Sequence, residues 1–430
     1  MTTNTGWLIR LRPAIAVGGL ALISLGAAPP SGRAWVAGLC GVAFALACRL
    51  CRPWTPVHGL VAMLGCVAVV SWTHAHDQQS ALSHLCGIAA GVLAMGLVAT
   101  WCPTPRRLLI AGAAMLALGG GMLGVGLATT RIPEPKLIPI EWTGRLPILS
   151  LRLPGMDPAG LVNPNALAAT GLLVAPLALA LLFVRRRPDV SHRGVRLLGL
   201  LVGSLAVTVL VVTESRSAWG AAWLMLFVGL WRIGRWSATI RAAAIALAVV
   251  VSAGGIFATA RRDPGLWEGL RPLSQPGRPA RWDRWQGSIE ARIDVWQPAL
   301  FELSRAPWFG VGLNEFRHIL RRPLDPTLGD MAHAHNMFLQ TALDLGLPGL
   351  AVYLALLGYL LVRAREAADG ADPTARCVAA GAGISLLAVH VFGLADAVPL
   401  GAKVGLLQWL ASGLILAAWQ IQRSGPHGGQ

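Results

Sequence analysis

The chain has 430 residues, of which 55% are hydrophobic and only 13% are charged, and it contains 50 glycines. A typical soluble domain carries about 25% charged residues, roughly twice this share. Together with a mean hydropathy of +0.59, this composition excludes a soluble globular enzyme, a disordered chain and a disulfide-rich secreted module. It predicts an all-helical protein that crosses a membrane many times.

The net charge of +16 invites a nucleic-acid interpretation, but the basic residues are almost all arginine. No basic run is interleaved with aromatic residues as a stacking surface requires. We therefore interpret the charge as loop charge that orients membrane helices, and we expect no nucleic-acid partner. The seven cysteines lie in apolar segments or at their edges, so no disulfide framework is predicted.

Apolar runs of the roughly 17–25 residues that a membrane helix needs occur about twelve times. The predicted spans are near 13–29, 34–50, 57–73, 80–101, 107–129, 161–184, 195–213, 217–232, 238–259, 336–362, 376–397 and 401–420. The first run resembles a signal peptide, but the many spans behind it favour an uncleaved helix.

Basic residues in the short loops predict the orientation. With a cytoplasmic N-terminus, the cytoplasmic segments hold eighteen arginines, whereas the short outer loops hold only Arg33, Arg216 and Lys403. We therefore expect both termini in the cytoplasm.

This topology divides the chain into five parts. They are membrane helices 1–5 (1–129), an outer loop (130–160), membrane helices 6–9 (161–259), a long outer loop (260–335), and membrane helices 10–12 with a cytoplasmic tail (336–430). A structureless loop as long as the second one would be unusual, and such length commonly signals function. The chemistry is therefore expected on the outer face.

The long outer loop contains a predicted amphipathic helix. Its apolar residues at helical spacing are Ile289, Ile293, Trp296, Leu300 and Leu303. Arg292 borders this inward face, where a guanidinium needs an anionic partner or a wet cavity.

A tight turn through Glu214 places Arg216 at the outer start of a predicted membrane helix. The backbone N–H groups and dipole of a helix N-terminus attract anions, and a planar guanidinium suits phosphate oxygens. An Arg216–Glu214 ion pair or anchoring to lipid headgroups is the alternative.

Two histidines, His333 and His335, come directly before the predicted span at 336–362. An imidazole held at a helix start on the outer face, as His335 would be, can act as a general base at neutral pH. Two alternatives stay open: capping of the helix, and a zinc site shared with the similar pair His74 and His76.

Within the predicted span 376–397, His390 and Asp396 could form a proton relay, although we favour a buried structural hydrogen bond. The outer face has no Asp-x-Asp pair to hold a divalent cation against a diphosphate. We therefore expect arginines to stabilise the charge, and no metal or other cofactor.

Three segments resemble the O-antigen ligase and polymerase superfamily, in the order and on the face that this family shows. The matching residues are Arg216 in a Ser-Arg turn, then Arg292, Trp296, Pro307, Gly310, Gly312 and Phe316, and finally His335, Asn336, Asp344, Gly346 and Gly349. Together the motifs cover about residues 205–352.

The resemblance implies a glycosyltransferase of the GT-C type at the periplasmic face of the bacterial inner membrane. It would transfer a glycan from undecaprenyl diphosphate without metal or nucleotide sugar. Arg216 and Arg292 would hold the donor diphosphate, and His335 would deprotonate or orient the acceptor hydroxyl. Asp344, where the family more often has Glu, would face away from His335 and act as a structural partner. His333, Asn336 and Glu214 are the remaining candidates.

The acceptor separates three activities. It is lipid A–core oligosaccharide for a ligase, another lipid-linked repeat for a polymerase, and a protein hydroxyl for an O-oligosaccharyltransferase. Modest length and the lack of a long C-terminal domain favour the ligase, with lipid-linked O-antigen, lipid A–core and membrane lipids as its partners. A flippase or transporter fits less well, because the predicted spans carry few ionisable groups.

Overall fold

The computed structural model describes residues 56–130, 162–184, 192–233, 289–320 and 333–424, and these ranges are all-helical with no strands. The predicted spans near 13–29, 34–50 and 238–259 lie outside the described residues. So do nearly all of the first outer loop and much of the second.

The long helices of the bundle are α3 (Pro56–His74), α4 (Gln78–Trp101), α5 (Pro105–Thr129), α6 (Pro164–Leu182), α7 (His192–Val212), α8 (Arg216–Ile233), α13 (Met337–Ala368), α14 (Pro373–Phe392) and α15 (Gly405–Ser424). Within the described ranges, seven helices are long and apolar enough to cross a membrane, and α8 and α15 are not among them. The chain is thus a multi-pass membrane protein. Each of these nine helices coincides with a predicted span, while the total of about twelve stays a prediction.

Several helices begin with the same device, a polar N-cap followed by a proline in the first turn. Thr104, Asn163 and Asp372 each accept a hydrogen bond from a backbone N–H of the first turn of α5, α6 and α14. The proline that follows lacks an N–H, and its fixed φ already suits a helix. These starts are therefore specified locally by the sequence.

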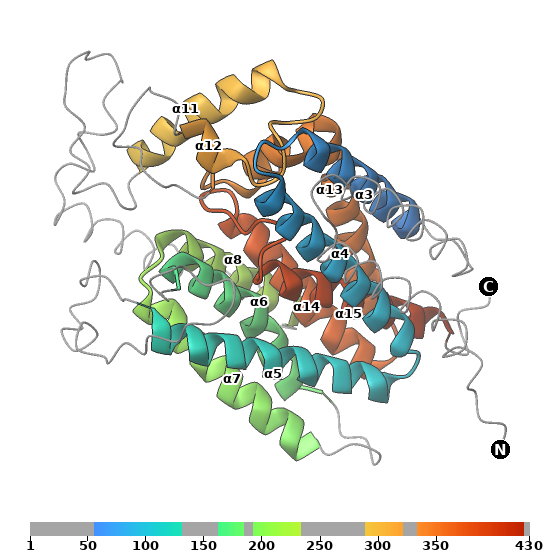
Figure 1. Cartoon of the computed structure of the whole chain (residues 1–430). Coiled ribbons are helices and arrows are strands. Elements are labelled where there is room, and N and C mark those ends of the chain that lie inside the picture. Colours follow the sequence, from blue (N-terminus) through green and yellow to red (C-terminus); the bar gives the residue numbers. More distant parts are fainter. Residues whose placement is uncertain (1–55, 131–161, 185–191, 234–288, 321–332, 425–430) are drawn as a thin grey trace.

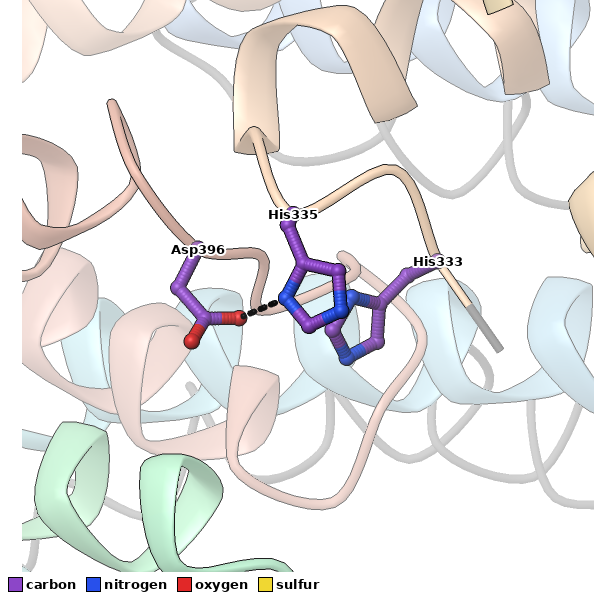
Figure 2. Close-up of side chains that lie close together, drawn as sticks. All are labelled: His333, His335 and Asp396. Atoms are coloured by element: carbon purple, nitrogen blue, oxygen red, sulfur yellow. Dashed lines mark hydrogen bonds and ion pairs between the residues drawn. The ribbon is translucent and has the colours of Figure 1, made fainter. Parts of the chain in front are cut away.

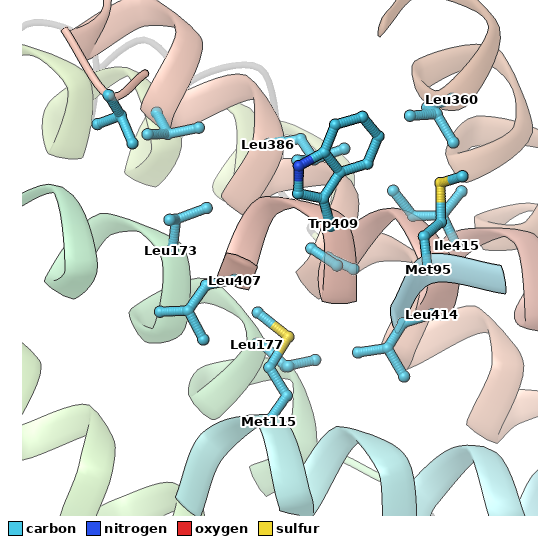
Figure 3. Close-up of a cluster of buried hydrophobic side chains, with 14 of the residues drawn as sticks. Met95, Met115, Leu173, Leu177, Leu360, Leu386, Leu407, Trp409, Leu414 and Ile415 are labelled. Atoms are coloured by element: carbon cyan, nitrogen blue, oxygen red, sulfur yellow. The ribbon is translucent and has the colours of Figure 1, made fainter. Parts of the chain in front are cut away.

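The core of the bundle lies around α14, which packs against α6, α8, α13 and α15 (Figure 1). Figure 3 shows buried side chains of α4, α5, α6, α13, α14 and α15 that pack together in this core. The labelled residues are Met95, Met115, Leu173, Leu177, Leu360, Leu386, Leu407, Trp409, Leu414 and Ile415. This apolar packing gives the end of α14 a fixed support.

Outside the bundle, α11 (Ile289–Arg305) and α12 (Phe316–Leu320) lie together at the top of Figure 1, against α13. We call this side the α11 end of the bundle. The helix predicted in the long loop is confirmed, but its predicted face is wrong in one place: Leu300 is 55% exposed, whereas Val295, Ala299 and Leu303 are buried. The buried stripe thus runs at 295, 299 and 303, one turn beyond Arg292.

One predicted span is broken, because α13 changes direction at Gly346, whose φ is +72°. The loop after α11 packs onto this kink through its backbone: Val311 N–H donates to Leu343 O (2.7 Å), and Leu347 N–H donates to Pro307 O (2.8 Å). A Cβ at Gly310 or at Gly346 would collide with backbone atoms of the other segment. The two glycine motifs therefore meet, and the absence of side chains permits the contact.

The end of α14 also differs from prediction. The helix ends at Phe392 and is capped by Gly393, so Asp396 lies in the loop that follows and not inside a membrane helix. The Asp396 carboxylate accepts a hydrogen bond from the N–H of Ala397, a local bond that competes with helix continuation. This loop lies at the α11 end.

Candidate functional site

The start of α13 is bonded to the loop after α14. Met337 N–H donates to Gly393 O (2.7 Å), and Asn336 Nδ2 donates to Leu394 O (3.1 Å). The Asn336 side chain also caps α13 by accepting from the N–H groups of Phe338 and Leu339. Asn336 thus holds two chain segments at a fixed spacing.

The segment before Asn336 is held by its backbone. Ala334, between the two histidines, is fully buried; its N–H donates to Gln340 Oε1 (2.9 Å), and its carbonyl accepts from Trp296 Nε1 (2.8 Å). His335 then adopts a left-handed backbone conformation with φ of +47°. The bonds from α11 and α13 therefore determine where the His335 ring points.

That ring meets Asp396. His335 Nδ1 lies 3.2 Å from Asp396 Oδ1, and the Asp396 side chain is only 1% exposed (Figure 2). Burial alone would raise the pKa of Asp396, but the hydrogen bond and the charges of the two histidines hold that pKa below its ordinary value. Asp396 is thus an anion suited to orienting His335 through Nδ1–H.

The sequence had paired Asp396 with His390, and that pairing is wrong. His390 Nε2 bonds to Tyr353 Oη (2.6 Å), and its Nδ1 bonds to Leu386 O (2.6 Å). The preferred interpretation of His390 as a buried structural hydrogen bond is confirmed. His390 lies inside α14 and Asp396 lies beyond its end at Phe392. The hydropathy pattern did not mark this helix end.

His333 packs edge-on against His335, with the ring centroids 4.5 Å apart (Figure 2). Burial, with the neighbouring His335, lowers the pKa of His333 to about 4. His333 is therefore neutral at pH 7. Its Nδ1 is buried without a hydrogen-bond partner in the part of the chain that the structure describes.

Arg292 reaches the same loop from α11. Its Nε donates to Ala395 O (2.5 Å), next to Asp396. Burial lowers the pKa of the half-buried guanidinium, the negative charge of Asp396 opposes this, and the positive charge of Arg216 adds to it. The charges of Arg292, Arg216 and Asp396 therefore act on one another in one region.

Arg216 is the first residue of α8, as predicted, and α8 packs against α14. The preceding Glu214 is buried with φ of +47°, in the turn that joins α7 to α8. Neither residue is without an interaction partner. The structure thus brings Arg216, Arg292, His335 and Asp396 to the ends of α8, α11, α13 and α14.

Asp344 does not belong to this group. Its Oδ1 accepts from Asn314 N–H (3.1 Å) and from Gln340 Nε2 (2.9 Å), and its carbonyl accepts from Ser71 Oγ. Through these bonds the buried Asp344 joins α13 to α3 and to the loop after α11. The geometry is that of the structural partner expected from the sequence.

His74 and His76, considered above as zinc ligands, make other contacts. His74 bonds to Val70 O and stacks on Phe309, and His76 lies near His318. Among the described residues, the group with metal-ligand spacing is His333, His335 and Asp396, with ligand atoms within 4.8 Å of one another.

The fold and this group of residues define a class: a multi-pass, helical membrane protein with arginine, histidine and aspartate side chains gathered at one end of its bundle. The model of the family described as O-antigen ligase matches residues 201–354. This matched segment, which is similar to that family, contains Arg216, Arg292 and His335. A comparison with curated proteins finds no match. Asp396 lies beyond the matched segment.

Proposed function

We propose that this protein is an O-antigen ligase. It transfers O-antigen polysaccharide from undecaprenyl diphosphate to lipid A–core oligosaccharide, and the α11 end faces the periplasm at the inner membrane. The observation that carries the proposal is the His335–Asp396 pair beside Arg292, within reach of the charge of Arg216. The family match over residues 201–354 supports the substrate class.

In the proposed reaction, His335 is the general base. A neutral imidazole that donates through Nδ1–H to Asp396 presents the lone pair of Nε2 to an acceptor hydroxyl. The hydroxyl oxygen attacks the anomeric carbon as its proton passes to Nε2. Asp396 keeps the ring in this tautomer and stabilises the imidazolium that forms.

The bond from the anomeric carbon to the diphosphate breaks in the same displacement, which inverts the configuration. Negative charge then grows on the departing undecaprenyl diphosphate. Arg292 and Arg216 are the groups that stabilise it, because a guanidinium can bind two phosphate oxygens at once. The helix N-terminus at Arg216 adds backbone N–H groups for the same charge.

Two further activities use the same chemistry on other acceptors: polymerisation of O-antigen repeats, and transfer to a protein hydroxyl. We favour the ligase because the matching family carries that description. The decisive test is purified protein supplied with lipid-linked O-antigen and lipid A–core. We expect a ladder of lipopolysaccharide bearing O-antigen, detected by gel.

Cells that lack the protein give a second readout. Loss of a ligase leaves polymerised chains on their lipid carrier and bare lipid A–core at the surface. Core capped by a single repeat would instead identify a polymerase and contradict the proposal.

A further inference from the structure

Besides the His335–Asp396 hydrogen bond, the side chains of His333, His335 and Asp396 are spaced like the ligands of a metal ion. Their potential ligand atoms lie within 4.8 Å of one another, and the three side chains point into one space (Figure 2). Asp396 and Nδ1 of His333 are buried, whereas the His335 side chain is 25% exposed.

The spacing is close to that of a metal site. Two ligands at about 2.0–2.1 Å from one tetrahedral zinc ion lie roughly 3.3 Å apart. His335 Nδ1 and Asp396 Oδ1 are already 3.2 Å apart. The set as a whole has to contract by roughly 1.5 Å to match that spacing, so metal binding requires a side-chain rotation of His333.

Two atoms of this group are buried without a hydrogen-bond partner among the described residues, namely His333 Nδ1 and Asp396 Oδ2. Buried polar atoms are nearly always paired, and an unpaired one costs about 1–3 kcal/mol. A cation bound between the three side chains would provide a partner for both.

We propose that His333, His335 and Asp396 form a binding site for Zn²⁺, and that zinc bound there inhibits the transfer reaction. The three side chains supply two imidazoles and one carboxylate, which leaves a fourth position for water. The binding half stands on the geometry alone, and the inhibition half rests on the proposed function.

The inhibition follows from the two nitrogens of His335. A neutral imidazole has one N–H and one lone pair. If zinc takes Nδ1, the proton moves to Nε2, which then donates and cannot accept the acceptor's proton. If zinc takes Nε2, the lone pair is used directly. Either mode removes the general base.

The surrounding charge limits the affinity. Arg292 and Arg216 place positive charge near Asp396, which opposes a second cation. We therefore expect zinc to be a reversible inhibitor that binds in the micromolar range and not a permanent component.

The test is titration of the metal-free purified protein with Zn²⁺ alone, by calorimetry or by competition with a chromophoric chelator. We expect one site that is weakened at least about tenfold in His333→Gln and in Asp396→Asn, since even the loss of a supporting group around a metal costs roughly that much. The thermal denaturation curve of each variant shows whether it is folded.

His318→Gln is the matched control. His318 is also half-buried, and its Nε2 lies 3.8 Å from a carboxylate oxygen of Asp77 and has no hydrogen-bond partner among the described residues. It does not belong to a group of three ligands at short spacing there. Its zinc affinity should equal that of the wild type. A wild type without a zinc site, or a His333→Gln variant of unchanged affinity, would overturn the proposal.

Because this titration needs neither donor nor acceptor, it stands even if the protein proves not to be a ligase. In the transfer assay, added zinc should inhibit, EDTA should restore the rate, and the inhibition curve should shift to higher zinc in His333→Gln. Zinc that binds at the three residues without slowing transfer would refute the inhibition half.

Discussion

Two histidines near the end of α14 that lies at the α11 end of the bundle have opposite surroundings. His390, inside the helix, uses both ring nitrogens, one on Tyr353 and one on a backbone carbonyl, and it is buried. His335 is 25% exposed and, within the described residues, makes its ring hydrogen bond through Nδ1 to the Asp396 carboxylate. The first arrangement leaves no lone pair for a substrate, whereas the second leaves one and orients it.

The comparison indicates that the role of each histidine depends on the hydrogen-bond partners of its ring nitrogens. A histidine satisfied by neutral partners on both sides stabilises a helix pair. A histidine whose ring donates to an anion on one side is held in the orientation that proton transfer requires.

The largest effect expected from this comparison is the loss of His335. His335→Gln should lower the rate of glycan transfer on the order of 10²–10⁴-fold, because Gln has no basic lone pair. His390→Gln should retain transfer and lose only stability, seen as a lower Tm. The measurement is transfer by the purified variants, and equal loss in both would show that the two regions do not differ in function.

The arginines should come next. Arg292→Lys and Arg216→Lys each lose a bidentate phosphate contact, which corresponds to roughly a 10- to 100-fold lower rate. Arg292→Lys should be the worse of the two, because it also loses the bond from Nε to the backbone beside Asp396. Initial rates against donor concentration would measure this, and full activity in both variants would refute a diphosphate clamp.

Within α13 a similar contrast concerns stability. Gly346→Ala should cost about 1–3 kcal/mol, because Ala is strained at a positive φ and its Cβ meets the backbone of Trp308. Gly358→Ala, on the same helix with open space around it, is the control and should keep or slightly raise the wild-type Tm, because Ala favours a helix more than Gly does. Thermal denaturation in detergent compares them, and equal Tm values would contradict the close packing at the kink.

The smallest effect should come from EDTA. Transfer by protein purified without added metal should be unchanged, because arginines are available for the charge that a metal would otherwise stabilise. The assay is transfer with and without chelator at fixed pH. Loss of activity on chelation, restored by a divalent ion, would contradict the metal-free mechanism.

The sequence predicted those parts of the fold that depend on local composition. Apolar runs and polar N-caps such as Asp372 mark nine of the described helices. The kink at Gly346 escaped prediction, since a helix with one break keeps the same hydropathy as a straight one. What fixes the kink is backbone contact with a segment more than thirty residues earlier.

Site residues were predictable where a single short segment of sequence identifies them. Arg216 at a helix start and His335 before another are visible in the sequence. Asp396 was not, because its role depends on α14 ending at Phe392 and on a partner 61 residues earlier. An ionisable residue close to the end of an apolar run was the available signal, and it could equally have belonged to the helix.

The left-handed backbone at His335 has a consequence for how this protein can evolve. A non-glycine residue in that conformation costs of order 1 kcal/mol or more, and it persists because bonds from Trp296, Gln340 and Asn336 impose it. The position of the ring is thus obtained at the expense of stability. Substitutions elsewhere that destabilise the bundle lower the same free energy of unfolding. Activity and stability therefore place opposite demands on this residue.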